Sequence, residues 1–174
     1  MTKKAFLILC LCIAAISCVY AGKVDFLGQV SPYSVQTVSA SSRKYVSNYG
    51  YGFKVGFRYE TTEHFAFGLD ASDTMFKFKE LGYDYQVIAL RAVAGYTYNF
   101  TEKLYANGEL GLGFSFKSIG GKRQTTFGIG AYLGGGFRLS NDFAVTLGAE
   151  LDFGLQSRSI DFAAKSQIGL LMSL

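Results

Sequence analysis

The chain has 174 residues, of which 49% are hydrophobic, 16% aromatic and 17% charged, and its formal net charge is +4. This weak positive charge, carried by scattered lysines and arginines, argues against a nucleic-acid-binding protein. The length suits a single domain.

The first 21 residues are typical of a cleaved secretory signal peptide. Lys3 and Lys4 precede an apolar run over residues 5–16, and small residues lead to a cleavage site between Ala21 and Gly22. The apolar run is shorter than the roughly 20 residues of a membrane-spanning helix. The sequence therefore predicts residues 1–21 as the signal peptide and 22–174 as the mature domain.

A second processing route stays open at Cys18. Residues 15–18 loosely resemble a lipobox, which would make Cys18 a lipid-bearing N-terminus, although the leucine usual three residues before the cysteine is missing. Cleavage after Ala21 would leave 153 of the 174 residues and remove all three cysteines. Loss of Lys3 and Lys4 from the 17 basic residues leaves 15 against 13 acidic ones. The mature domain is then free of disulfides.

Residues 49–60 show the pattern that dominates the rest of the chain. Tyrosine, phenylalanine and valine occupy every odd position, and glycine, lysine, arginine and glutamate occupy the even ones. A period of two predicts an extended strand with one apolar and one polar face.

The same alternation predicts eight strands, at residues 23–31, 45–60, 64–72, 83–99, 104–117, 125–139, 143–156 and 162–174. Phe76 and Phe78 could extend the third strand only after a shift of face. Tight connections at 61–63, 100–103 and 140–142 alternate with longer ones at 32–44, 73–82, 118–124 and 157–161. Pro32 falls at the start of the first long connection. Such alternation predicts an antiparallel up-and-down meander, and short turns at one end with longer loops at the other are typical of outer-membrane barrels.

The volume of the barrel decides which face points inward. Eight strands enclose a lumen only just wide enough for side chains to fill it, and the large apolar residues are too many to fit. The other face is rich in glycine and charge, which suits a narrow lumen. In lipid a closed barrel satisfies every backbone polar group, so the apolar face is predicted to point outward, into lipid. The exceptions are Leu27, Val87, Val93, Tyr105, Tyr132 and Leu171, which fall on the inward face, and Gly28, Gly108, Gly135 and Ser166, which fall on the outward one.

Segments 95–100 (GYTYNF) and 104–114 (LYANGELGLGF), with the signal peptide and the eight strands, resemble the small outer-membrane β-barrels of the OmpX and OmpA type. The resemblance implies an eight-stranded all-β barrel in the outer membrane of a double-membraned bacterium. It also implies assembly by the barrel-assembly machinery, which recognises a last strand that commonly ends in phenylalanine; here the last residue is Leu174. No C-terminal peptidoglycan-binding domain of the kind found in some relatives is expected.

Inward charges of both signs occur in equal numbers, which favours a salt-bridged plug over an ion-selective channel. The predicted lumen charge network consists of Lys54, Asp70, Arg91, Glu109, Glu150, Asp152 and Lys165. We interpret it as structural, because no nucleophile, cofactor box or metal-ligand cluster accompanies it.

The single histidine, His64, is expected at a tight turn on the periplasmic side. A lipid hydrolase acting on the outer leaflet would need it at the opposite rim, so we interpret His64 as a solvated turn residue and predict that the protein is not an enzyme. The predicted role is structural or surface-interactive. A narrow pore for small solutes, a lipid-modifying enzyme and a soluble periplasmic barrel remain as alternatives.

The expected partners are lipopolysaccharide or another surface glycolipid, the assembly machinery, and a host or surface ligand contacted through the loops. Basic residues in 43–44, 77–79 and 122–123 are the basis for the loop contacts. No cofactor is expected, and the barrel is expected to be monomeric.

Overall fold

The structure is a computed structural model that describes residues 23–40, 43–61, 64–79, 83–119, 122–155 and 160–174. The predicted signal peptide, with its cleavage site at Ala21 and Gly22 and the alternative lipidation at Cys18, lies outside the described residues. Among the described residues, no helix is long and apolar enough to cross a membrane.

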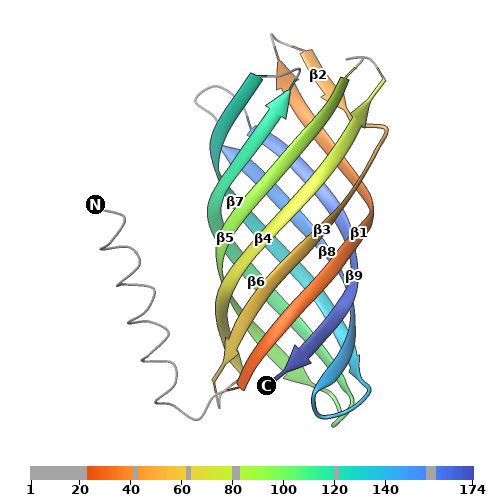
Figure 1. The fold of residues 1–174 in the computed structure, drawn as a ribbon, viewed down its shortest axis with the longest axis vertical. Helices are drawn as coiled ribbons and strands as arrows, with labels where there is room; N and C mark the ends of the chain where they lie inside the picture. Colours follow the sequence, from red (N-terminus) through yellow and green to blue (C-terminus); the bar gives the residue numbers. More distant parts are fainter. Residues whose placement is uncertain (1–22, 41–42, 62–63, 80–82, 120–121, 156–159) are drawn as a thin grey trace, which may run out of the picture.

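The described chain is all β and confirms the predicted barrel. Its strands are β1 (Lys23–Ala40), β2 (Arg43–Val46), β3 (Tyr49–Glu60), β4 (Phe65–Phe78), β5 (Tyr83–Asn99), β6 (Leu104–Ile119), β7 (Lys122–Arg138), β8 (Phe143–Leu155) and β9 (Ile160–Ser173). Each of β3 to β9 pairs antiparallel with the next, and β1 pairs with both β3 and β9, which closes eight strands into a barrel (Figure 1). The short β2 pairs with the upper part of β1.

The two ends of the barrel differ. We call the end with connections 61–64, 100–103 and 139–142 the turn end; it also holds the start of β1 and the C-terminus (Figure 1). The opposite end, with connections 41–42, 79–82, 120–121 and 156–159, is the loop end.

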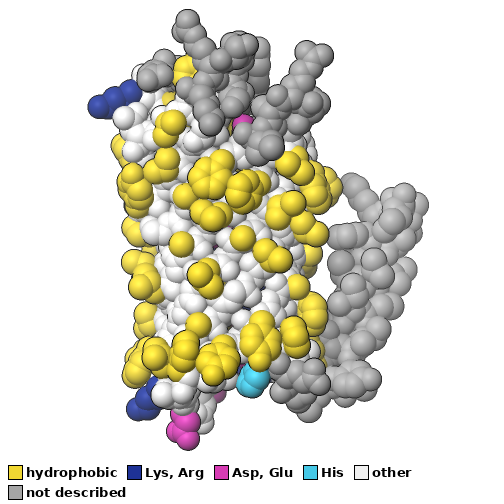
Figure 2. Space-filling view, turned by 180° about the vertical axis from the view of Figure 1, so that it is seen from behind, with side chains coloured by type: hydrophobic (Ala, Val, Ile, Leu, Met, Phe, Trp, Pro, Cys, Tyr) yellow, Lys and Arg dark blue, Asp and Glu magenta, His cyan; other side chains and the backbone are white. Residues whose placement is uncertain are grey.

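The outer surface is apolar. Phenylalanine, leucine, isoleucine, valine and tyrosine side chains are exposed on all eight barrel strands. Figure 2 shows hydrophobic side chains gathered in an upper and a lower band, with fewer between them. On β3, Tyr49 and Tyr59 lie ten residues apart, which is about 25 Å along the barrel axis at the usual rise and a tilt of roughly 40°. That height matches the apolar band of membrane barrels, so the surface is built for a bilayer and not for water.

The strands extend further toward the loop end than the sequence predicted. Residues 32–40 belong to β1, and 73–78 belong to β4, so the predicted long connections at 32–44 and 73–82 are wrong. The register between β4 and its neighbours is unbroken, and Phe76 and Phe78 point inward without any shift of face. The prediction fails there because the strand continues with apolar side chains on its lumen face.

Pro32 lies in a β-bulge within β1 and not in a loop. Between the pairs Val30–Ile168 and Ser34–Lys165, β1 advances by four residues while β9 advances by three. A bulge tolerates proline because its residues leave the regular ladder. The hydroxyl of Ser166 accepts a hydrogen bond from the Tyr33 N–H (3.2 Å) and donates one to the Tyr33 carbonyl (2.9 Å). Ser166 therefore lies on the outward face because it satisfies the backbone of the bulge.

Glycines on the lumen face make room for tyrosines. Tyr132 is buried in the lumen, and a Cβ added to Gly134 or Gly148 would collide with its phenol ring. Large side chains cross this narrow lumen where the facing residue is glycine.

Candidate functional site in the barrel lumen

Arg58 anchors one cluster of charges in the lumen. It projects from β3 between Asp70 of β4 and Glu109 of β6. Its guanidinium donates two hydrogen bonds to the Asp70 carboxylate (2.6 and 3.0 Å) and two to the Glu109 carboxylate (2.6 and 3.0 Å). Such paired, charge-assisted contacts fix geometry as well as charge.

Glu150 of β8 anchors a second cluster. Its carboxylate accepts hydrogen bonds from Lys54 (2.9 Å), Arg91 (2.7 Å) and Gln167 (3.1 Å). Lys165, its register partner on β9, lies 3.6 Å away. These contacts join β3, β5, β8 and β9 across the barrel axis.

Asp152 completes this cluster, two residues further along β8. It lies 2.6 Å from Arg91 and 2.6 Å from Lys165. Arg91 and Lys165 each contact both carboxylates of β8. A chain of alternating charges therefore runs across the lumen.

We call these eight residues the lumen network: Lys54, Arg58, Asp70, Arg91, Glu109, Glu150, Asp152 and Lys165. Their side chains are between 3% and 12% exposed. The four cations match the four carboxylates, so every charge in the network has a partner. Buried charges need such pairing because their desolvation is costly.

The structure places all seven residues of the predicted network in ion pairs. Arg58 is not part of the predicted network, although it lies on the polar face of residues 49–60 and anchors the first cluster. The alternation along β3 predicts that the Arg58 side chain points into the lumen. Its partners depend on the register of β3 with β4 and on the distance across the lumen to β6, and the alternation specifies neither.

A separate buried ion pair joins Lys117 of β6 to Asp161 of β9 nearer the loop end. Asp161 was predicted in the connection 157–161, but it belongs to β9 and is 2% exposed. Asp161 belongs to a strand because the barrel wall extends beyond the apolar outer surface toward the loop end.

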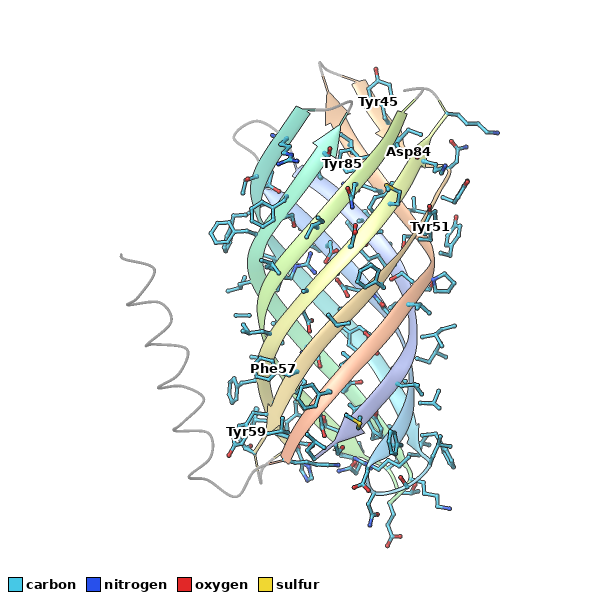
Figure 3. The ribbon with its side chains drawn as sticks, viewed as in Figure 1. Tyr45, Tyr51, Phe57, Tyr59, Asp84 and Tyr85 are labelled. Carbon is cyan, nitrogen blue, oxygen red and sulfur yellow. The ribbon has the colours of Figure 1, made fainter. Side chains whose placement is uncertain are left out.

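Apolar side chains close the lumen beside this pair. We call Val38, Phe76, Phe78, Tyr85, Val87 and Ala163 the apolar cap; Tyr45 packs against it. Phe76 is 0% exposed and packs near Tyr85 (ring centroids 6.3 Å apart). Figure 3 shows Tyr85 near the loop end, with Tyr45 above it. Of the cap residues, only Val87 was predicted on the inward face. The cap as a whole was not predicted, because apolar side chains were otherwise expected to face lipid.

The cavities between these layers are small. One of about 20 Å³ lies between the apolar cap and the lumen network, and its lining includes Phe76, Lys117 and Asp152. A second of about 10 Å³ lies within the network, beside Lys54, Glu109 and Tyr132. A water molecule needs about 10–15 Å³, so these cavities have room for single waters and not for a solute.

The turn end of the lumen is narrowed by Arg138 and Tyr105. The guanidinium of Arg138 lies over the Tyr105 ring, 4.6 Å from its centroid, and donates a hydrogen bond to the Asn99 side chain (2.8 Å). Tyr105 is buried.

His64 lies at the turn end, just before β4, where the sequence analysis expected it. Its φ of 68° is the one positive value among the non-glycine residues that the structure describes. Its Nδ1 lies 3.5 Å from the Asn99 amide nitrogen and 3.8 Å from the Glu60 carboxylate. In the described part of the chain, no three His, Cys, Asp or Glu side chains gather as metal ligands.

No protein-family model and no curated protein matches the sequence. Solved structures do match in fold. Neisserial surface protein A superposes with a TM-score of 0.62 at 16% identity, covering 87% of this chain and 97% of that one. Ail, the attachment invasion locus protein of Yersinia pestis, solved with the heparin analogue sucrose octasulfate, gives 0.56 at 18% identity, covering 88% and 99%. The outer membrane enzyme PagL gives 0.52 at 14% identity, covering 84% and 98%.

These structures share the fold of eight-stranded outer-membrane barrels. The shared fold supports the predicted outer-membrane location. It leaves the activity open, because the same barrel occurs in a surface protein, in an attachment protein and in an enzyme.

Proposed function

We propose that this protein is a monomeric outer-membrane barrel with a sealed lumen, which serves the membrane structurally and interacts with molecules at the cell surface. The charge-balanced lumen network is the observation that carries the proposal. A conducting lumen would need an open path and, for ion selectivity, an excess of one charge. Here the cations and carboxylates bind one another, and the apolar cap covers the loop end.

A role without catalysis is part of the proposal. His64, the residue most suited to acid–base chemistry, lies at the turn end, whereas the outer leaflet surrounds the loop end. Its polar neighbours Glu60 and Asn99 do not form a nucleophile–base pair with it. Each carboxylate of the lumen network is paired with at least one cation, which suits a role as counter-ion.

The loop end is where we propose contact with partners. Lys79 and Arg123 are exposed there, and cations at this rim suit the phosphates of lipopolysaccharide or another glycolipid, or an anionic host molecule. The complex of Ail with the heparin analogue sucrose octasulfate gives a precedent in the same fold. The barrel-assembly machinery is the proposed partner during biogenesis.

Conductance in planar bilayers tests the sealed lumen. The purified barrel is expected to insert without steady single-channel steps, while a known porin in the same membrane supplies the positive control. Reproducible steps whose size changes in Glu150→Gln would show current through the lumen and would replace this proposal with a narrow pore.

Replacement of the hairpin tip at 79–82 by a short uncharged turn, together with Arg123→Gln, tests the surface role. Binding of the purified barrel to lipopolysaccharide-containing vesicles is expected to weaken. Unchanged binding would remove the loop end as the contact surface.

A further inference from the structure

The larger cavity of the lumen, between the apolar cap and the lumen network, has polar side chains in its wall. Its volume of about 20 Å³ is room for one water molecule. Its lining includes Gln36 of β1, Arg91 of β5, Lys117 of β6 and Asp152 of β8. Four strands of the barrel thus bring polar groups to one small space.

Two polar atoms of these lining residues are unpaired within the protein. Arg91 Nε and Gln36 Oε1 are buried, and among the described residues neither has a hydrogen-bond partner. Arg91 is 8% exposed and Gln36 is 3% exposed. Buried polar atoms without any partner are rare in folded proteins because they lose their bonds to water and gain none. One is a donor and the other an acceptor, so a ligand that both accepts and donates would satisfy them.

Other contacts hold both side chains in place. The Arg91 guanidinium donates a hydrogen bond to Glu150 (2.7 Å) and lies 2.6 Å from Asp152. The Gln36 side-chain amide donates a long hydrogen bond (3.5 Å) to the hydroxyl of Tyr85 in the apolar cap. Neither side chain can turn toward a new partner without losing these contacts.

The register of β1, β9 and β8 leaves a gap beside these atoms. Ala163 of β9 pairs with Gln36 on one side and with Asp152 on the other. Residues on alternate strands of a sheet lie roughly 10 Å apart, and the methyl group of Ala163 is too short to fill that distance. Arg91 reaches Asp152 from across the lumen, so the gap lies between the ends of the Arg91 and Gln36 side chains.

The charges around the cavity favour a neutral ligand. The lumen network pairs four cations with four carboxylates, and Lys117 pairs with Asp161. A bound ion would add a buried charge that nothing balances. Water is neutral, donates and accepts hydrogen bonds, and fits the volume.

We propose that this cavity binds one ordered water molecule, which accepts a hydrogen bond from Arg91 Nε–H and donates one to Gln36 Oε1. The inference rests on the proposed sealed lumen, because an open lumen would hold a column of exchanging water in place of one bound molecule. The ammonium of Lys117, which carries three N–H donors, can supply a third partner. Since Gln36 also contacts Tyr85, the water links the lumen network to the apolar cap.

A high-resolution crystal structure of the mature barrel, grown with bromide in place of chloride, tests the site. Density for one water oxygen is expected at about 2.7–3.2 Å from both Arg91 Nε and Gln36 Oε1, without the anomalous signal of bromide. Absence of density would overturn the water site, because the cavity would be dry. An anomalous peak would also overturn it, because the ligand would be an anion.

A matched pair of variants tests the site in detergent micelles. Ala163→Val and Ala163→Thr add side chains of the same shape beside the cavity, and both are β-branched. The threonine hydroxyl can take over a hydrogen bond of the water, whereas valine displaces the water and offers no hydrogen bond. The midpoint of thermal unfolding, read from gel mobility, is expected to be roughly 2–8 °C higher for Ala163→Thr than for Ala163→Val.

A valine variant at least as stable as the threonine variant would overturn the site, because an apolar cavity would then be filled better by a methyl group than by a hydroxyl. If neither variant folds, the density in the wild-type crystal decides. Absent density together with absent conductance would remove the water and leave the sealed barrel standing. Steady conductance would contradict the sealed lumen whatever the density.

Discussion

At the scale of single residues, Glu150 is the carboxylate that pairs with three cations of the lumen network. It touches Lys54, Arg91, Lys165 and Gln167 while being 3% exposed. Removal of its charge would leave three cations with fewer carboxylates in a narrow, buried lumen. The loss of one partner from a buried ion pair is far more costly than the net value of the pair.

Glu150→Gln is therefore expected to lower the free energy of unfolding by about 3–5 kcal/mol. Denaturant titration of the barrel in detergent micelles measures the change. Glu102→Gln, at an exposed turn position, serves as the control and is expected to change stability by less than about 0.5 kcal/mol. Equal stability of both variants would mean that the lumen network does not support the fold.

Ser166 gives a second residue-level prediction, on the lipid side. Ser166→Ala would leave the N–H and carbonyl of Tyr33 without their partner where little water is available. We expect a loss of about 1–3 kcal/mol, measured by the same titration. Ser166→Thr keeps the hydroxyl and is expected to retain most of the stability. If alanine and threonine behave alike, the hydroxyl does not stabilise the bulge.

The lumen charges show which features of single residues the sequence can predict. The alternation along each strand predicted correctly that Lys54 and Glu150 point inward. Their contact joins residues 96 positions apart on β3 and β8, and it exists only because the barrel closes. The role of Arg58 was missed for the same reason.

At the scale of elements, β4 is the strand whose lumen face becomes apolar toward the loop end. Over its turn-end half the outer face is apolar, and over its loop-end half the apolar residues Phe76 and Phe78 face the lumen. If these two phenylalanines faced lipid, the alternation of inward and outward residues along β4 would have to shift by one residue. Only the pairing of β4 with β3 and β5 shows that the strand is continuous.

Phenylalanines on the two faces of this wall should respond differently to truncation. Phe76→Ala removes a fully buried ring from the apolar cap and is expected to cost about 3–5 kcal/mol. Phe53→Ala, on the neighbouring β3, removes a ring that is 53% exposed to the surroundings, and lipid or detergent can fill the space. We expect the smaller loss there. A Phe53→Ala loss as large as that of Phe76→Ala would contradict the assignment of the two faces.

At the scale of the whole molecule, the lumen is obstructed at three levels. The apolar cap lies at the loop end, the lumen network in the middle, and Arg138 stacks on Tyr105 toward the turn end. Each level uses a different interaction, so one substitution is not expected to open a path through the barrel. The expectation of no steady conductance follows from these layers together.

The sequence by itself determined the fold class, the number of barrel strands and the direction of their faces. These follow from local alternation and from the limited volume that eight strands enclose. The tertiary structure alone decided which charges pair, where β1 and β4 end, why Ser166 faces lipid, and that apolar residues close the loop end. The physical reason is that both the pairing across the lumen and the register around the sheet depend on how the barrel closes. The alternation along a single strand carries no information about that closure.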